Sequence, residues 1–212
     1  MIDHKIIQTI VSENNSFVIT CHINPDADAI GSEIALKYYL DSLGKDARII
    51  NFSPTPENLF FLDKSKVIEQ FDIGVHQAPI IDADVIMLLD FNHLSRVADM
   101  QESIKKSKAI TICIDHHEPN DPYAEHLLIE TEYSSTGEIV FEILDNNNNF
   151  EWNIDLALPL YAAIMTDTGS FRYERTTDRT HKIAARLIQM GVDPRSTHST
   201  IYDQQSAGQL KL

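Results

Sequence analysis

Cysteine and long apolar runs are both scarce in this sequence. Only two of the 212 residues are cysteine, and Cys21 and Cys113 lie in apolar, strand-like runs that favour free buried thiols over a disulfide. A Cys-rich zinc site or a disulfide framework is thereby excluded. No apolar run approaches the roughly 20 residues of a membrane-spanning helix, and residues 1–5 are too polar to begin a signal peptide. We therefore expect a cytoplasmic protein with no membrane partner.

Positive charge is also in short supply. The sequence has 17 Lys and Arg against 32 Asp and Glu, a net charge of −15 without a long run of either sign. No basic face is available to bind nucleic acid phosphates, so long duplex nucleic acid is not an expected partner. A phosphate-bearing ligand would need another source of positive charge. The 43% of hydrophobic residues is enough for a buried core, which excludes a mainly disordered chain.

Short apolar runs alternate with amphipathic segments along the chain. The runs predict buried strands at residues 17–21, 47–52, 85–89 and 110–114. The 3.6-residue patterns predict helices at residues 6–11, 26–43, 97–106, 136–145, 156–165 and 180–190, and one after 191. Four consecutive asparagines at 146–149 predict a loop. This alternation predicts an α/β fold in which a parallel β-sheet has helices on both faces.

Three of the predicted strands run directly into Asp or His. The strand ends are followed by His22, by Asp90 and by Asp115-His116-His117, and Asp167-Thr168-Gly169 follows an apolar helix. Ligands of open parallel sheets collect at the carboxyl ends of the strands, so these side chains should converge. A single such Asp is more often a helix cap or a turn residue. Four clusters in one chain indicate a site.

The first cluster, His22-Ile23-Asn24-Pro25-Asp26-Ala27-Asp28, directly precedes a predicted helix. Either Asp could be no more than the N-cap of that helix. However, one cap is needed and three potential ligands are present. Across the four clusters, imidazole with several carboxylates and no thiolate suits a divalent cation such as Mn²⁺ better than a tetrahedral structural zinc. The number of carboxylates favours two metal ions over one.

The clusters together resemble a known family. His22 to Ser32, Asp90, Asp115-His116-His117 and Asp167-Thr168-Gly169 are similar, in order and spacing, to the four motifs of the DHH phosphoesterase superfamily. Within it, three further features resemble the group of bifunctional oligoribonucleases and 3′-phosphoadenosine 5′-phosphate phosphatases, also called nanoRNases. They are Arg96, the stretch 134–137 and the stretch 167–173. The resemblance covers nearly the whole chain.

The resemblance implies a set of residue roles. His22, Asp26 and Asp90 would bind one manganese, and the other would be bound by Asp28, Asp90, His116 and Asp167. Asp90 would bridge the two, and Mg²⁺ or Co²⁺ could substitute. His117 would face the substrate phosphate and Asp115 would orient its neighbours. Arg96 is either a phosphate contact or a surface salt bridge. Two divalent ions would add four positive charges where an acidic protein must bind an anion.

The activity implied is manganese-dependent hydrolysis of short oligoribonucleotides and 3′-phosphoadenosine 5′-phosphate, by direct attack of a hydroxide that two metals activate. The expected partner is a short single-stranded RNA or a small phosphorylated nucleotide. Two alternatives stay open. One is the same core acting on pyrophosphate, polyphosphate or cyclic or linear dinucleotides. The other is a non-catalytic nucleotide-binding module.

The resemblance also implies a domain organisation. Residues 1–190 would form the DHH catalytic domain, and 191–212 a helix with the start of a linker. In the nanoRNase group such a linker leads to a C-terminal DHH-associated domain that binds substrate, which this sequence lacks. A truncated chain and a natural single-domain form both stay open, as does a homodimer. Without that domain we expect manganese binding but slow hydrolysis of nucleotides.

Overall fold

The computed structural model describes residues 4–118, 123–146 and 150–203. Most of the asparagine loop expected at 146–149 and the end of the last helix, expected near residue 208, lie outside these ranges. None of the helices in the described ranges has both the length and the apolarity needed to cross a bilayer. Cys21 and Cys113 are both buried and unbridged, so the predicted free thiols are confirmed.

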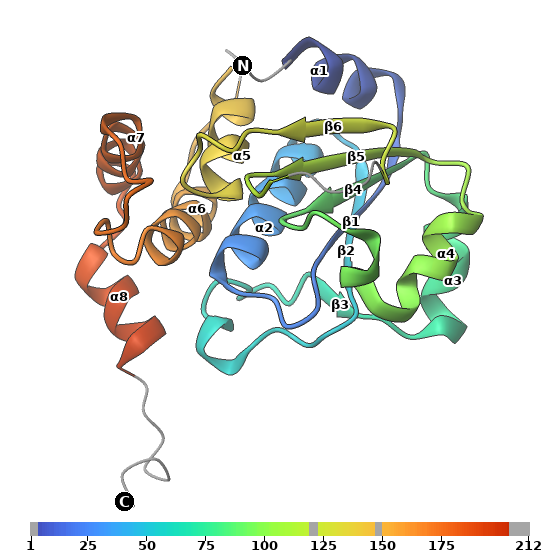
Figure 1. Cartoon of the computed structure of the whole chain (residues 1–212), viewed down its shortest axis with the longest axis horizontal. Coiled ribbons are helices and arrows are strands. Elements are labelled where there is room, and N and C mark those ends of the chain that lie inside the picture. The colour runs from blue at the N-terminus through green and yellow to red at the C-terminus, as the bar shows by residue number, and fades with distance from the viewer. Residues whose placement is uncertain (1–3, 119–122, 147–149, 204–212) are drawn as a thin grey trace, which may run out of the picture.

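A six-stranded parallel sheet forms the centre of the molecule (Figure 1). In spatial order its strands are β3 (Ile68–Gln70), β2 (Asp46–Asn51), β1 (Ser16–Cys21), β4 (Val85–Leu89), β5 (Ile110–Asp115) and β6 (His126–Ile129). Every neighbouring pair is parallel. All five residues of β4 are buried, because a central strand covered on both faces has no solvated side.

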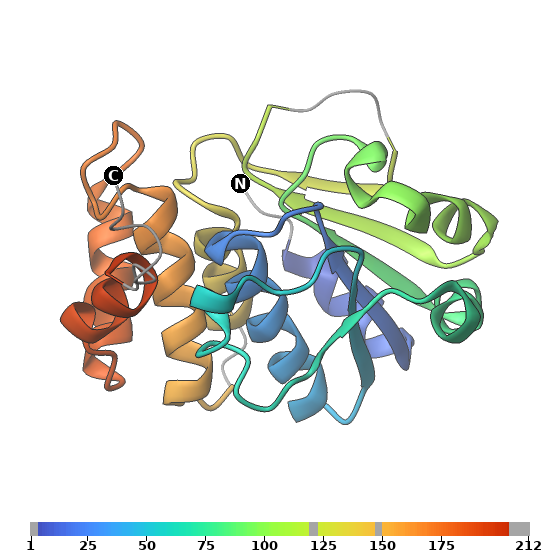
Figure 2. The ribbon, with the colours of Figure 1, turned by 90° about the horizontal axis from the view of Figure 1, so that it is seen from below.

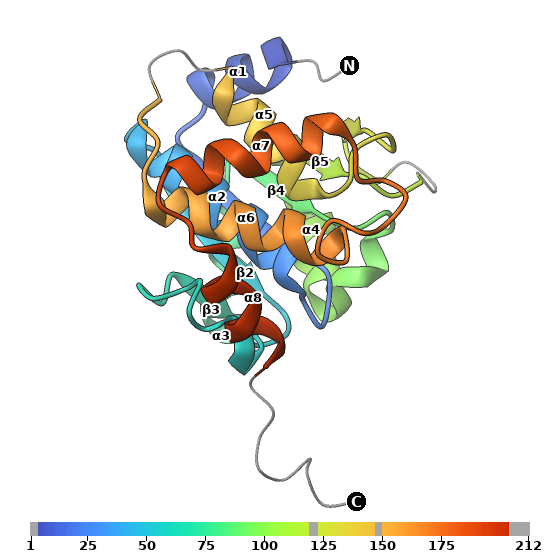
Figure 3. The same ribbon diagram turned by 90° about the vertical axis from the view of Figure 1, so that its left-hand side faces the viewer.

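Helices cover both faces of this sheet (Figure 2). One face carries α1 (His4–Glu13), α2 (Ala27–Ser42), α5 (Thr136–Asp145) and α6 (Ile154–Asp167). The other carries α3 (Ile73–Asp82), the 3₁₀ segment η2 (Leu94–Met100) and α4 (Gln101–Lys106). Outside α6 lie α7 (Asp178–Gln189) and α8 (Pro194–Tyr202) (Figure 3), and α8 also contacts the short η1 (Glu57–Leu59). The predicted α/β class is confirmed.

Two strands and one α-helix were not predicted, and one helix was predicted wrongly. The strands β3 and β6 lie at the two edges of the sheet, and they are only three and four residues long with one buried residue between them. The helix α3 was not predicted either, since only two of its residues are buried. The helix expected at 97–106 is interrupted, because Ala98, within η2, has the non-helical angles φ 47° and ψ −130°.

Two glycines allow α2, α5 and α6 to pack closely near the carboxyl edge of the sheet. A Cβ on Gly31 would lie 2.3 Å from the carbonyl oxygen of Pro159 in α6. A Cβ on Gly137 would lie 2.6 Å from the Ala163 Cβ, also in α6, and 3.2 Å from Asp28 Oδ1. Both distances are shorter than van der Waals contact allows, so any larger residue would push these helices apart. This packing holds the start of α5 against the start of α2.

Candidate metal centre

The four sequence clusters meet at the carboxyl edge of the sheet. The ends of β1, β4 and β5 bring His22, Asp90 and Asp115-His116-His117 together, and the end of α6 brings Asp167. Three groups of potential ligand atoms each lie within 4.8 Å of one another. They are His22, Asp26 and Asp90; Asp28, His116 and Asp167; and Asp90, Asp115, His116 and His117. Adjacent parallel strands end side by side, which is why residues far apart in sequence converge here.

The first group combines an oriented imidazole with a helix cap. His22 Nδ1 lies 2.8 Å from the Ile23 carbonyl oxygen, so this nitrogen donates and Nε2 is left to face Asp90 Oδ2 at 3.5 Å. Asp26 is the N-cap of α2, because its Oδ1 accepts from the backbone N–H groups of Asp28 and Ala29. Its second oxygen remains for another partner. Capping and ligation are therefore compatible in Asp26.

The second group is centred on a buried imidazole. His116 Nε2 lies 3.2 Å from Asp167 Oδ2, 3.7 Å from Asp90 Oδ1 and 3.8 Å from Asp28 Oδ2. Yet neither ring nitrogen has a hydrogen-bond partner of acceptable geometry in the described part of the chain. A buried polar atom without a partner is costly. An imidazole facing several carboxylates is the donor set of a divalent cation of intermediate hardness, so the residues present fit such an ion.

The N-terminus of α5 supports two of these carboxylates. The backbone N–H groups of Thr136 and Gly137 donate to Asp28 Oδ2 and Oδ1 at 2.7 and 2.8 Å. The Thr136 hydroxyl donates to Asp90 Oδ1 at 3.0 Å. A helix N-terminus carries partial positive charge and unpaired N–H groups, and both favour a carboxylate. Asp28 is therefore fixed by a helix other than its own, a contact that the sequence did not indicate.

Asp90 occupies an unusual backbone conformation. Its φ is 61°, in the left-handed region, and its N–H donates to the Ile114 carbonyl oxygen at the end of β5. Asp and Asn tolerate this region better than other residues with a side chain, apart from glycine. The turn directs a carboxylate that is only 3% exposed toward both His22 and His116. Asp90 belongs to the first group, and its carboxylate also clusters with His116 of the second.

The pKa values of the carboxyl groups in the cluster are shifted, because several of them are buried close together. Burial, with the charges of Asp90 and Asp167, raises the pKa of Asp28 well above its ordinary value. Burial and the charges of Asp90 and Asp26 raise the pKa of Asp167 to about 7. Burial also opposes charge on Asp90, but the hydrogen bond from His22 and the nearby imidazoles outweigh it and lower the pKa of Asp90. Such a site favours the binding of cations.

His117 differs from His116 in its exposure and its partner. Its Nδ1 donates to Asp115 Oδ1 at 2.7 Å, and its backbone N–H donates to the same oxygen. The side chain is half exposed. The hydrogen bond to Asp115 raises the pKa of His117 above its ordinary value. Nε2 is thus left free to face a ligand at the mouth of the site, and Asp115 fixes the orientation of the ring.

Two arginines, one of them predicted from the sequence, lie near the site. The side chain of Arg96 is exposed and forms no ion pair in residues 4–118, 123–146 and 150–203, so a contact with a substrate phosphate stays a prediction. Its carbonyl oxygen instead accepts from the Ile23 N–H, which joins the loops after β4 and β1. The unpredicted Arg175 donates to the His116 carbonyl oxygen at 3.3 Å. The only sequence feature that could have indicated Arg175 is its position a few residues after Asp167.

Glu33 is a second group that sequence reasoning missed. It lies in α2, fully buried behind His22, and its Oε2 accepts from Asn51 Nδ2 at 2.7 Å. Burial raises the pKa of Glu33 to about 8, although the hydrogen bond from Asn51 opposes this. A buried carboxyl of this kind keeps its proton at neutral pH. The helical pattern of α2 alone did not predict that Glu33 is buried. Its burial is explained by the contact with Asn51, which only the structure shows.

Glu33 should make the metal-free protein less stable as pH rises. From pH 4.5 an unfolded Glu loses its proton, whereas buried Glu33 keeps it to about pH 8. The folded state thus binds more protons in this window, and stability falls with pH. Glu33→Gln should remove the part of this pH dependence that Glu33 contributes. That part is on the order of a few kcal/mol of the free energy of unfolding between pH 5 and pH 8. Urea denaturation of both proteins at the two pH values measures it, and equal losses would show that Glu33 is ionised in the fold.

The fold and the cluster define a class before any relative is considered. The chain is a parallel α/β domain with a candidate divalent-metal centre at the carboxyl edge of its sheet. It belongs to the DHH family, whose N-terminal domain matches residues 16–164. The family that the four motifs predicted is therefore confirmed.

Similar proteins agree on the family but differ in what their names describe. The bifunctional oligoribonuclease and PAP phosphatase NrnA of Thermus thermophilus is 32% identical over 174 residues, 82% of this chain and 50% of that protein. A manganese-dependent inorganic pyrophosphatase of Methanocaldococcus jannaschii is 31% identical over 80% of this chain and 53% of that protein. The solved exopolyphosphatase-related protein of Bacteroides fragilis matches with a TM-score of 0.92 and 31% identity, over 98% of this chain and 62% of that one. The chain thus spans about half the length of these two curated relatives.

Proposed function

We propose that the chain is the catalytic domain of a manganese-dependent phosphoesterase. The observation that carries this proposal is the pair of ligand groups that come together at Asp90, with the ring nitrogens of buried His116 lacking a hydrogen-bond partner among the described residues. We assign His22, Asp26 and Asp90 to one ion, and Asp28, Asp90, His116 and Asp167 to the other. When bound, two such ions supply a nucleophile at neutral pH and neutralise charge on the phosphoryl oxygens.

The remaining residues act on the substrate and on the ligands. His117 donates from Nε2 to a phosphoryl oxygen, a role that its raised pKa and half-exposed ring favour. Asp115 accepts from His117 Nδ1 and so keeps that ring in place. Thr136 and Gly137 hold Asp28 and Asp90 so that the carboxylates do not rotate away when charge changes.

We propose short oligoribonucleotides and 3′-phosphoadenosine 5′-phosphate as substrates. The support is the 32% identity to the oligoribonuclease and PAP phosphatase of Thermus thermophilus. Inorganic pyrophosphate is the second candidate, since the manganese-dependent pyrophosphatase is 31% identical. All three substrates carry a phosphoryl group that could reach the same centre, so the reaction is common to both candidates.

A comparison of turnover with and without metal tests the proposal. We expect the Mn²⁺-loaded protein to hydrolyse a diribonucleotide and 3′-phosphoadenosine 5′-phosphate faster than pyrophosphate, and removal of metal by a chelator to reduce all rates to background. Restoring Mn²⁺ should restore activity, which controls for denaturation. Faster turnover of pyrophosphate would select the second candidate, and unchanged rates after metal removal would refute the metal-dependent mechanism.

A further inference from the structure

A pocket of about 430 Å³ lies beside the edge strand β3. Its walls come from the loop after β2, from the segment between η1 and β3, and from β3 itself. Its lining includes Ser53, Phe60, Asp63, Lys64 and Lys66. The volume falls within the roughly 300–1,000 Å³ of small-molecule sites. The roles assigned to the metal centre make no use of this pocket.

A direct contact connects this pocket to the metal centre. The backbone N–H of Asn24 donates to Ser53 Oγ at 3.0 Å, and Asn24 lies between His22 and Asp26 in the first motif. Ser53 therefore belongs both to the wall of the pocket and to the support of the motif loop. Neighbouring strands are about 4.8 Å apart, so β3 lies about 10 Å from β1. A ligand longer than one nucleotide could extend from the centre into the pocket.

The lining offers an aromatic face and unpaired positive charge. Phe60 is 56% exposed. Lys64 and Lys66 are exposed and form no ion pair with any residue that the structure describes. Asp63 forms no ion pair with either lysine in the described part of the chain, and its two carboxylate oxygens accept from the N–H groups of Val67 and Ile68. In a chain of net charge −15, exposed lysines beside an exposed ring form a local site for a base and a phosphate.

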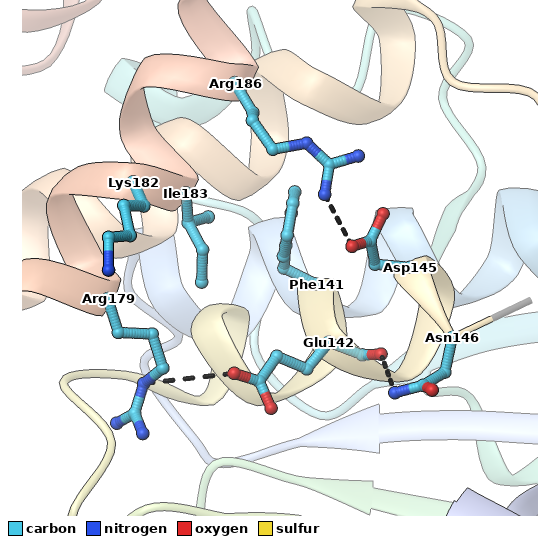
Figure 4. Close-up of a pocket in the computed structure, with 8 residues that line it drawn as sticks. All are labelled: Phe141, Glu142, Asp145, Asn146, Arg179, Lys182, Ile183 and Arg186. Atoms are coloured by element: carbon cyan, nitrogen blue, oxygen red, sulfur yellow. Dashed lines mark hydrogen bonds and ion pairs between the residues drawn. The ribbon is translucent and has the colours of Figure 1, made fainter.

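A second cleft provides a contrast (Figure 4). It measures about 370 Å³ between α5 and α7 and presents Arg179, Lys182 and Arg186. Each of these cations is already paired: Arg179 with Glu138, Lys182 with Asp178, and Arg186 with Asp145. No comparable pairing neutralises Lys64 and Lys66 among the described residues. The pocket beside β3 is therefore the better candidate for an anionic ligand.

We infer that this pocket binds one further nucleotide of a short oligoribonucleotide, beyond the nucleotide whose phosphate lies at the metal centre. The inference rests on the proposed function. The base stacks on Phe60, and Lys64 and Lys66 contact a phosphate. Such a site lengthens the preferred substrate to three or more nucleotides, and it contributes nothing to 3′-phosphoadenosine 5′-phosphate or pyrophosphate, which are too short to span both sites.

Phe60→Leu tests the aromatic face, because leucine keeps an apolar side chain but cannot stack. With Mn²⁺, kcat/KM for a triribonucleotide should fall about tenfold, the scale of one base–aromatic stack, and kcat/KM for pyrophosphate should stay within twofold. Phe60→Tyr should restore the triribonucleotide value. The double variant Lys64→Ala/Lys66→Ala should show the same selective loss, whereas Lys105→Ala, an exposed lysine on α4, should not.

Equal kcat/KM of Phe60→Leu and wild type on the triribonucleotide, or an equal loss on pyrophosphate, would overturn the inference. If the wild type hydrolyses none of these substrates, the proposed function fails separately. Titration calorimetry with the same triribonucleotide and Mn²⁺ then decides about the pocket. Weaker binding to Phe60→Leu than to wild type would support the inference, and identical binding would refute it.

Discussion

Asp90→Ala is expected to abolish hydrolysis and to leave the fold intact. The carboxylate of Asp90 lies 3.5 Å from His22 Nε2 in the first proposed metal group and 3.7 Å from His116 Nε2 in the second, and Asp90 is 3% exposed at the end of a central strand. Its removal would leave two cations without the carboxylate that fixes their spacing. The measurement is kcat/KM on a diribonucleotide with Mn²⁺, together with the thermal transition of the variant.

Two further variants make this test specific. Asp90→Asn should also be inactive, although asparagine tolerates the left-handed backbone at this position. That result would separate loss of charge from backbone strain. Asp99→Ala, which removes an exposed carboxylate in η2, should keep full activity. More than about a tenth of wild-type activity in Asp90→Ala would show that Asp90 is not the bridge.

His117→Ala should lower turnover by about 10²–10³ while manganese content stays nearly unchanged. The reason is that His117 is half exposed with Nδ1 already donating to Asp115, which suits the proposed contact of its Nε2 with the substrate. A donor to the phosphoryl oxygens mainly stabilises charge that develops in the transition state. Turnover assays and metal analysis of the purified variant give the two quantities.

The matched variant is His116→Ala. His116 is buried with both ring nitrogens unpartnered among the described residues, so its loss should reduce both bound manganese and activity. His93→Ala, an exposed histidine that caps η2, should change neither. If His117→Ala loses one manganese and His116→Ala retains both, the roles of the two histidines must be exchanged.

Much of the architecture could be predicted because the central strands are marked by their burial. The strand β4 was predicted with its observed bounds, since five consecutive apolar residues are covered on both faces. The helix α5 was also predicted with its observed bounds, since Ser135 caps it and its apolar face is regular. The edge strand β3 has three residues and two of them are polar. Its position depends on pairing with β2, which is a long-range contact that no local pattern reports.

The candidate site also has one part that could be predicted from the sequence and one part that could not. The potential ligands were predictable because strand ends in parallel sheets point to one edge, and the structure brings His22, Asp90 and His116 together there. The supporting contacts were not predictable. Asp28 accepts from N–H groups more than a hundred residues away, at the start of α5. Arg175 reaches the His116 carbonyl oxygen only because the loop after α6 folds back over the site.

A titration with Mn²⁺ followed by electron paramagnetic resonance is the most direct test of a two-metal centre joined by Asp90. The wild-type protein should bind two ions per chain, and the saturated sample should show the spectrum of a magnetically coupled pair, because two ions about 3.5–4 Å apart share one carboxylate. Asp90→Ala should lose the coupled signal. A wild-type protein that saturates with a single ion, or that binds two uncoupled ions, would contradict this account.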